Sequence, residues 1–596
     1  MTLGVRKGWG WLLLALVAPA LVLGSAPAAS AQSCGIGLTA GPSQVRFPLS
    51  AIPYPGAATF SETFDVTYPP SLANETLTLE YLNGSQWYKL ENFTANGLGF
   101  TETSYGLDSG WVRFGATSVR VAGGACYSNT ATFDVGYDPS AVALDAAAYA
   151  AVAGSVLAFF LLGRRLGWRR FLILAIPAYL ALSPWTGQRY DVYFLISSGI
   201  RVLQHVNPFT PGNPPVYPGP LKWAYPPIYP VYSALSYLVY QAFTGAHLPS
   251  VSSLTWPGWI TATYNVYLAF VPSNLPVLVA LLKAPMVASA FLTGWLLTKM
   301  TGRGSTSVLW IANPLVILVA AVWGQLDPIA TLMAVASLYY FQKGRTYHAY
   351  LFASFGAAVK VWPAIMIPIM LVISVRRVGL KAAVRPIAAV IPAVALTMGL
   401  YAEYGNVLDS LFVFLYARGI PTFAGAFTVN GLTWQEVLFV LKSPPVPLFL
   451  YAGVPIYAAL LVWIYRTNDT DVVKWTLVSI LVLFLTYNYV NPQYFYWVLP
   501  LFLLQGRRLS YVAFTAVPLA FMAFAYDLFY FVSPAILRDE YVLGASIADQ
   551  IKVNYFYQTD WLLILIAAAI PTAMYALSLF SQLAPMRRDA QATENV

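Results

Sequence analysis

Residues 363–385 read PAIMIPIMLVISVRRVGLKAAVR, an apolar run that leads into Arg376, Arg377, Lys381 and Arg385. This pattern is typical of a membrane helix followed by a cytoplasmic loop, because Lys and Arg accumulate on the cytoplasmic side. Apolar runs with short basic clusters recur from about residue 141 to residue 588. They predict an all-α polytopic membrane domain.

The composition agrees with this interpretation. Hydrophobic residues make up 58% of the 596 residues and charged residues only 10%, whereas soluble domains carry about 25% charged residues. A soluble enzyme is excluded because there is too little charge to hydrate its surface, and 15% aromatic residues exclude a disordered chain. The formal net charge of +9 does not indicate nucleic-acid binding, because the basic residues lie between apolar runs.

Orienting the apolar runs by their basic clusters predicts about 13 transmembrane helices, with every cluster on one side. Several runs are shorter than the roughly 20 residues that a helix needs to cross the hydrocarbon. The expected spans are 142–162, 171–185, 274–298, 306–322, 328–341, 346–361, 363–375, 386–402, 446–465, 473–487, 493–505, 509–529 and 561–582.

The N-terminus has the features of a secretory signal peptide over residues 1–31. Arg6 and Lys7 precede an apolar stretch, and Ala29-Ser30-Ala31 forms a cleavage site of the A-x-A type. An uncleaved anchor helix is the alternative. We expect the following residues to lie outside the cytosol.

Residues 33–140 differ from the rest of the chain. Short alternating runs at 76–82 and 110–114 predict half-buried strands. Asn83-Gly84 is typical of a hairpin turn between strands. We therefore expect an extracytosolic antiparallel β-sandwich of immunoglobulin or fibronectin type.

Charge, sequons and cysteines all favour an extracytosolic position for residues 33–140. The segment has four Lys or Arg against nine Asp or Glu. Asn74, Asn83 and Asn92 begin glycosylation sequons, for each of which chance occurrence is the alternative. The two cysteines of the chain, Cys34 and Cys126, can form a disulfide in an oxidising compartment.

The first candidate site residue is Asp191. We expect it near the start of an interfacial helix over 189–207, within a long outside section. Asp191, Ser198 and His205 share one face of such a helix, with Arg201 at its edge. A carboxylate at the membrane boundary can have a raised pKa, which suits a general base. A helix-start acid without a catalytic role is the alternative.

The second candidate lies in Trp323-Gly324-Gln325-Leu326-Asp327-Pro328, between two apolar runs. Asp327 falls where the chain turns on the outside, and an acid at a membrane boundary is costly enough to suggest a function. The alternative is a capping residue, because Pro328 can open the next helix with Asp327 near its start.

The third and fourth candidates are two lysines within apolar runs and two aromatic segments. Lys283 and Lys360 are expected near the outer half of the membrane, where a lipid phosphate can neutralise a buried ammonium; snorkelling is the alternative. Residues 225–230 and 491–497 are rich in Tyr, Phe and Trp. They are typical of an interfacial belt, or they stack on a sugar.

Together these segments resemble the GT-C superfamily of polyprenyl-phosphate-sugar-dependent glycosyltransferases over residues 171–582. The similarity is greatest to prokaryotic polyprenyl-phosphate-mannose transferases and to the catalytic subunit of the GPI first mannosyltransferase. The resemblance is carried by an ordered set, which consists of Asp191, Gly199, Asn207-Pro208-Phe209, Tyr225-Pro226-Pro227, Lys283-Ala284-Pro285, Asn313-Pro314, Trp323 to Asp327, Lys360 with Pro363, and Gln493-Tyr494 with Trp497 and Pro500.

The resemblance implies transfer of a hexose, expected to be mannose, from a polyprenyl-phosphate donor to a lipid or glycan acceptor, with inversion. Asp191 and Asp327 are the implied catalytic residues. The implied substrate-binding residues are Arg201, Tyr225, Lys283, Gln325, Lys360, Gln493 and Tyr494. The GPI enzyme has an Asp-x-Asp where this chain has Arg189 before Asp191, so we expect no metal and no cofactor.

The expected domains are the signal peptide at 1–31, the sandwich at 33–140, a linking transmembrane helix with a basic loop at 141–170, the glycosyltransferase domain at 171–582 and a cytoplasmic tail at 583–596. We expect a multi-pass protein of the cell membrane whose sandwich contacts an acceptor or a protein partner. A lipid-linked-sugar transporter, a surface scaffold and an oligosaccharyltransferase stay open as alternatives. A transporter typically has inverted repeats, and an oligosaccharyltransferase usually has a metal and a large soluble C-terminal domain.

Overall fold

The computed structural model describes strands in the N-terminal region and helices in the rest of the chain. The described residues are 35–41, 44–47, 61–83, 85–106, 115–124, 126–137, 154, 157, 161, 167–187, 189–206, 226–248, 274–403, 432–434, 448–467, 469–487, 490–525 and 568–583. The predicted signal peptide, most of the linking segment 141–170 and the tail beyond Leu583 lie outside them. The chain divides into two compact units, and each is described by itself.

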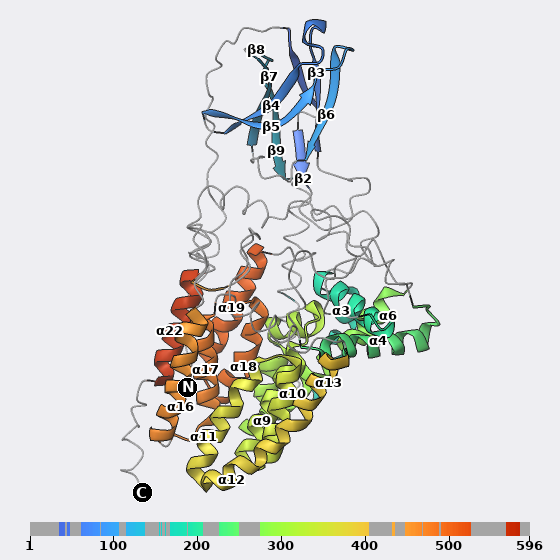
Figure 1. Cartoon of the computed structure of the whole chain (residues 1–596). Helices are drawn as coiled ribbons and strands as arrows, with labels where there is room; N and C mark the ends of the chain where they lie inside the picture. The colour runs from blue at the N-terminus through green and yellow to red at the C-terminus, as the bar shows by residue number, and fades with distance from the viewer. Residues whose placement is uncertain are drawn as a thin grey trace. The chain divides into compact units, whose positions relative to one another are not determined.

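The first unit consists of two β-sheets, drawn in blue in Figure 1. One sheet has the order β1 (Gly37–Gly41), β3 (Ser61–Thr67) and β6 (Phe100–Gly106). The other has the order β2 (Gln44–Phe47), β9 (Ala131–Tyr137), β7 (Gly115–Gly123), β4 (Thr76–Asn83) and β5 (Gln86–Thr94), and β8 (Cys126–Tyr127) pairs with β7. The pairs β1–β3, β4–β5, β4–β7 and β7–β8 are antiparallel. The predicted β-sheet region is confirmed, and its immunoglobulin or fibronectin type stays a prediction.

Alternation along the strands builds the core of this unit. Leu77 and Leu79 of β4 are fully buried, since successive side chains of a strand point to opposite faces. The rings of Phe64 in β3 and Phe133 in β9 lie 6.2 Å apart, which joins the two sheets. Asn83 pairs with Gln86 across the β4–β5 hairpin, so Asn83 is the last residue of β4 and the turn begins one residue later than the predicted Asn83-Gly84. The predicted strand at 110–114 lies outside the described residues.

The predicted modification sites of this unit are placed only in part. Asn74 and Asn92 are exposed, and Asn92 accepts a hydrogen bond of 2.9 Å from the Thr78 hydroxyl. Cys126 is half-buried in β8, whereas Cys34 lies outside the described residues. The glycosylation and the disulfide therefore stay predictions.

The second unit is helical. Its longer helices are α2 (Trp168–Leu182), α3 (Arg189–Leu203), α4 (Ile228–Thr244), α6 (Leu275–Thr301), α7 (Gly304–Ile311), α9 (Asp327–Gln342), α10 (Thr346–Val359), α11 (Met366–Val378), α13 (Ile391–Glu403), α16 (Val454–Thr467), α17 (Val472–Thr486), α18 (Phe495–Leu504), α19 (Arg508–Ala525) and α22 (Ile570–Leu583). The shorter segments are η2 (Ser183–Trp185), α8 (Pro314–Ile317), the π-helical η4 (Leu318–Trp323), η5 (Trp362–Ile365), α12 (Leu380–Val384), η6 (Arg385–Val390), the π-helical η7 (Phe449–Gly453) and η8 (Pro492–Tyr494).

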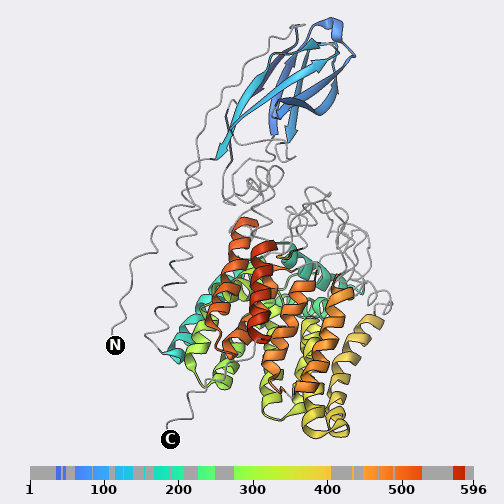
Figure 2. The same ribbon diagram turned by 90° about the vertical axis from the view of Figure 1, so that its left-hand side faces the viewer.

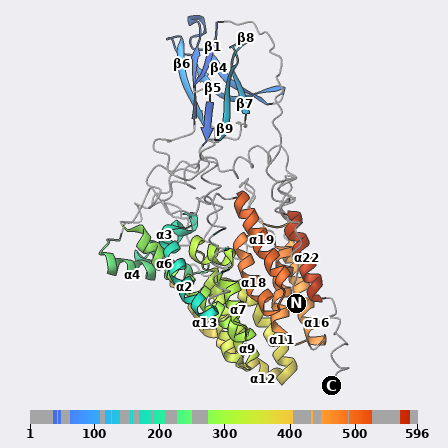
Figure 3. The same ribbon diagram turned by 180° about the vertical axis from the view of Figure 1, so that it is seen from behind.

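Aromatic packing joins the C-terminal helices, which are neighbours in Figures 2 and 3. The rings of Phe484 in α17 and Tyr575 in α22 lie 5.3 Å apart, and those of Phe495 in α18 and Phe514 in α19 lie 5.6 Å apart. These rings belong to the large buried core of the unit. A smaller core joins α3 and α4 to the first turns of α6.

The expected thirteen spans are not supported. Among the described residues, two helical segments are long and apolar enough to cross a membrane, Leu275–Thr301 and Leu380–Glu403. A third is added if the bent pair Gly304–Ile311 and Pro314–Trp323 is one span. This is enough to indicate membrane association, and the topology of the chain stays a prediction.

A helix break within an apolar run is one reason for the difference. The expected span 306–322 bends by 60° between α7 and α8. The Asn313 side chain accepts hydrogen bonds from the amides of Leu315 and Val316 and so caps a new helix. Pro314 has no amide hydrogen with which to continue the old one. Apolar runs therefore do not map one to one onto unbroken helices.

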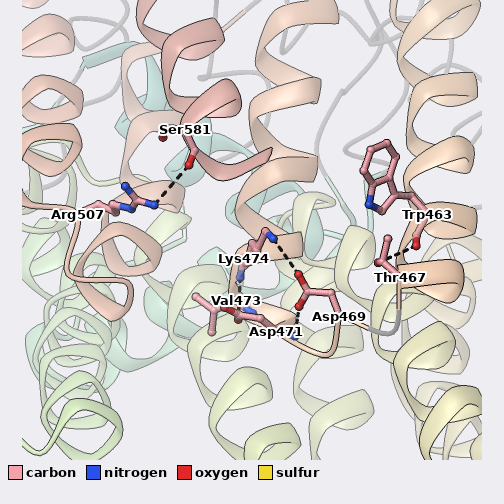
Figure 4. A network of polar contacts seen from close by, with 8 residues as sticks. All are labelled: Trp463, Thr467, Asp469, Asp471, Val473, Lys474, Arg507 and Ser581. Atoms are coloured by element: carbon pink, nitrogen blue, oxygen red, sulfur yellow. Dashed lines mark hydrogen bonds and ion pairs between the residues drawn. The ribbon is translucent and has the colours of Figure 1, made fainter. Parts of the chain in front are cut away.

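Two arginines of the predicted basic loops bond to backbone carbonyls of neighbouring segments. Arg377 donates to the Thr470 carbonyl (3.3 Å) and Arg507 to the Ser581 carbonyl (3.4 Å). Figure 4 shows Arg507, just before α19, with Ser581 of α22, and Lys474 of α17 paired with Asp469, which precedes that helix. The end of α11 at Arg377 therefore contacts the loop before α17, and the loop before α19 contacts the end of α22.

Candidate active site

A helix break over residues 323–327 organises the candidate site. The π-helical η4 ends at Trp323, and Gly324 has a φ of +91°, a left-handed conformation that favours glycine. A Cβ on Gly324 would lie only 3.0 Å from Lys283 Cε. Pro328 follows Asp327 at the start of α9, as predicted. The break lets one short segment direct several polar side chains to the same place.

Asp327 does not cap α9. No side chain caps the N-terminus of this helix. Instead, Asp327 Oδ2 accepts from Lys360 Nζ (2.9 Å) and Oδ1 accepts from Trp497 Nε1 (2.6 Å). Asp327 is fully buried and Lys360 is 6% exposed. The capping alternative is wrong, and Lys360 does not snorkel to the surface.

Two aromatic rings contact this ion pair, and a third stacks on one of them. The ring of Tyr494 stacks on Trp497 with centroids 4.2 Å apart, and Trp362 stacks on Trp497 at 5.5 Å. Lys360 Nζ lies 5.6 Å from the centroid of the Tyr494 ring. The predicted aromatic segment 491–497 is therefore a wall of the candidate site rather than only an interfacial belt.

Asp191 lies in the first turn of α3 and is half-buried. Its Oδ2 accepts a hydrogen bond of 2.6 Å from Trp323 Nε1, and Gln325 provides a second side-chain hydrogen bond. Burial raises the pKa of Asp191, and the hydrogen bonds from Trp323 and Gln325 lower it by less. The net shift is upward, as we expected for a boundary carboxylate.

The two carboxylates are electrostatically coupled. The charge on Lys360 lowers the pKa of Asp191, and the charge on Asp327 raises it. Trp323 and Gln325 contact Asp191, while Asp327 of the same segment contacts Lys360. Four of the predicted residues, Asp191, Gln325, Asp327 and Lys360, therefore form one cluster.

The other predicted residues vary in position. Lys283 is 1% exposed, and the partners of its ammonium are protein oxygens of residues 186, 321 and 322 rather than Asp327. Arg201 is buried in the last turn of α3. Gln493 is buried in η8 beside Tyr494. Tyr225 lies outside the described residues.

The face predicted for the helix from Asp191 is correct only in part. Ser198 is fully buried, with its hydroxyl bonded to the Leu195 carbonyl. The helix ends at Leu203, however, and His205 is exposed in a left-handed conformation with φ 55°. His205 therefore does not share the face of Asp191.

The sequence did not predict that two tryptophans donate hydrogen bonds to the carboxylates. Trp323 and Trp497 both lie in segments that the sequence singled out, but aromatic residues at a boundary are usually belt residues. The two hydrogen bonds join residues that are 132 and 170 positions apart in the sequence. Periodicity carries no information about contacts at such separations.

No group of three or more His, Cys, Asp or Glu side chains that could hold a metal ion occurs among the described residues. Comparisons with protein-family models and with curated proteins find no match to this chain.

Proposed function

We propose that the helical unit is an integral-membrane glycosyltransferase that moves a hexose, mannose in the first instance, from a polyprenyl-phosphate donor to a lipid or glycan acceptor. The observation that carries the proposal is the segment 323–327, which contacts Asp191 through Trp323 and Gln325 and brings Asp327 to Lys360. This clustering matches the roles that the GT-C resemblance implies. A scaffold has no evident need for two coupled carboxylates.

Asp191 is the general base in this proposal. The acceptor hydroxyl oxygen attacks the anomeric carbon, its proton passes to Asp191, and the bond from that carbon to the phosphate oxygen breaks with inversion. A raised pKa brings Asp191 closer to the operating pH, which favours proton transfer. The Trp323 hydrogen bond fixes the orientation of the carboxylate.

Lys360 is the cation that we assign to the leaving phosphate. Charge develops on the phosphate as the bond breaks, and a positioned ammonium in a poorly hydrated site stabilises it. Both oxygens of Asp327 are engaged by Lys360 and Trp497. We therefore assign Asp327 to positioning Lys360 rather than to contact with the sugar.

Unused polar atoms support the binding of a hydroxyl-rich ligand. Gln325 Oε1, Gln493 Oε1 and Trp362 Nε1 are buried without a hydrogen-bond partner. Buried polar groups are usually satisfied, and exceptions often mark functional sites. A sugar offers both donors and acceptors to such groups, and the Tyr494 and Trp362 rings offer apolar surface.

The proposal includes a multi-pass arrangement with the Asp191 cluster and the β-sheet unit on the extracytosolic side. It is supported within the helical unit by the position of the charges along single segments. Lys360 precedes η5 and α11, whereas Arg376 and Arg377 end α11. A helix rises about 1.5 Å per residue, so the two groups lie at opposite ends of the segment.

The test is Asp191→Asn in membranes supplied with labelled polyprenyl-phosphate mannose. We expect transfer to fall by roughly 10²–10⁴, because a general base is removed. The matched control is Asp469→Asn, the same substitution at the other end of the helical unit, which should transfer at the wild-type rate. Undiminished transfer by Asp191→Asn would remove Asp191 from the mechanism.

The pH dependence is a second readout of the same test. Only ionised Asp191 accepts a proton, so kcat/KM falls as the pH drops through the raised pKa of this residue. The acid limb should lie above the ordinary Asp value of about 3.9. In Lys360→Met, the acid limb of the residual transfer should lie at higher pH, because Lys360 lowers the pKa of Asp191.

A further inference from the structure

The Lys283 ammonium of α6 is surrounded by oxygens of the chain itself. Its Nζ donates to the Thr186 carbonyl (2.6 Å) and lies 3.1 Å from the Thr186 hydroxyl. It also lies 2.9 Å from each of the carbonyls of Ala321 and Val322. An ammonium has three donors, so these protein oxygens occupy its hydrogen-bonding capacity.

The oxygens come from two segments that lead directly into the candidate site. Thr186 follows η2 and stands five residues before Asp191. Ala321 and Val322 belong to η4 and immediately precede Trp323, the donor to Asp191. Lys283 therefore joins the segment that leads to Asp191 with the segment that leads to Trp323, the residue that orients Asp191.

The junction is tight as well as polar. The Thr186 hydroxyl also bonds to the Ala321 carbonyl (3.1 Å). A Cβ on Gly187 would lie 2.8 Å from Val192 Cγ2, which leaves no room for a larger residue. The carbonyls come from the C-terminal ends of helical segments, where the helix dipole favours a cation.

We infer that Lys283 is a positioning residue that clamps the segment 186–187 to the end of η4 and so sets Asp191 against Trp323. This inference rests on the proposed function and replaces the phosphate-binding role that the sequence suggested for Lys283. Lys283 acts through the two segments and does not contact the substrate. Lys360 keeps its assignment to the leaving phosphate.

The test is Lys283→Met in the full chain, with Lys299→Met as the matched control on the same helix. Two readouts are taken: kcat and donor KM with polyprenyl-phosphate mannose, and amide hydrogen exchange of the peptides containing Thr186 and Val322. We expect kcat to fall about 10–100-fold with donor KM changed less than about threefold, because a small misplacement of a catalytic group has large kinetic effects. Exchange should rise in both peptides together, and Lys299→Met should change neither readout.

A raised donor KM with unchanged kcat would overturn the inference, because it would mean that Lys283 binds the phosphate. Unchanged exchange in both peptides would overturn it as well. A wild-type chain without transfer would overturn the proposed function and the catalytic part of this inference, and the exchange result would then test the clamp alone. If Lys283→Met does not fold, Thr186→Val removes one hydroxyl of the clamp and should act in the same direction with a smaller effect.

Discussion

Two ion pairs at two ends of the helical unit have almost the same length and different surroundings. Lys360 and Asp327 are 2.9 Å apart, with side chains 8% and 0% exposed. Lys474 and Asp469 are 2.8 Å apart, with side chains 18% and 30% exposed (Figure 4). Distance alone would rank them as equals. Their burial indicates that the first is energetically demanding and the second is not.

The physical reason is desolvation. Taking an ion pair out of water costs several kcal/mol per ion, which the mutual attraction rarely exceeds by much. An exposed pair loses little hydration and contributes about 0–1 kcal/mol. A chain therefore gains little stability from placing Asp327 and Lys360 in its interior. We interpret the buried pair as part of a functional site and the half-exposed pair as a feature of the start of α17.

The largest effect on stability is expected for Lys360→Met. The substitution leaves the Asp327 carboxylate buried without its cation, which should lower the free energy of unfolding by about 3–5 kcal/mol. Thermal and denaturant unfolding of the detergent-solubilised chain measure it. Combining Lys360→Met with Asp327→Asn should restore much of the stability without restoring transfer. If Lys360→Met alone kept wild-type stability, burial would not distinguish the two ion pairs.

An intermediate effect is expected for Trp497→Phe. The ring is kept in part, but the donor to Asp327 Oδ1 is lost, and a hydrogen bond to a charged group contributes about 1.5–3 kcal/mol. The same unfolding measurement applies. Trp463→Phe is the control, because this tryptophan is 55% exposed and should have almost no effect. Equal losses of stability in the two variants would mean that the hydrogen bond to Asp327 makes no contribution of its own.

The smallest effect is expected for Lys474→Met. Removing one partner of this half-exposed pair should change the free energy of unfolding by less than about 1 kcal/mol. The effect should shrink further at high salt, because exposed charges are screened. A loss above about 2 kcal/mol that persists in 1 M salt, where the Debye length is about 3 Å, would contradict the distinction between the two ends.

The composition of the candidate site was largely predictable from the sequence. Scarce charged residues within apolar surroundings are few enough to be noticed, and Asp191, Gln325, Asp327 and Lys360 do meet. Their partners were not predictable in the same way. The sequence left Asp327 as either a cap or a functional acid, and only the fold brings it to Lys360 and Trp497.

For the helices, by contrast, the sequence predicted the apolar runs but not the number of unbroken helices. Hydropathy identified the apolar runs correctly, and Leu275–Thr301 is a long apolar helix over the expected span 274–298. It did not identify where those runs bend or change helix type, because that depends on local capping such as that of Asn313 and on tertiary contacts. The Lys283 clamp was missed for a related reason. Its acceptors are backbone carbonyls, which every residue has and which therefore leave no signal in a sequence.

The π-helical turn η4 makes the length of the chain at this point as important as its chemistry. A π-turn holds one residue more than an α-helical turn would. Inserting one further residue between Leu318 and Val322, with the helix continuing in regular geometry, would rotate Trp323 by about 100° relative to the preceding helix. Asp191 would then face a different side chain, even though every named functional residue was still present.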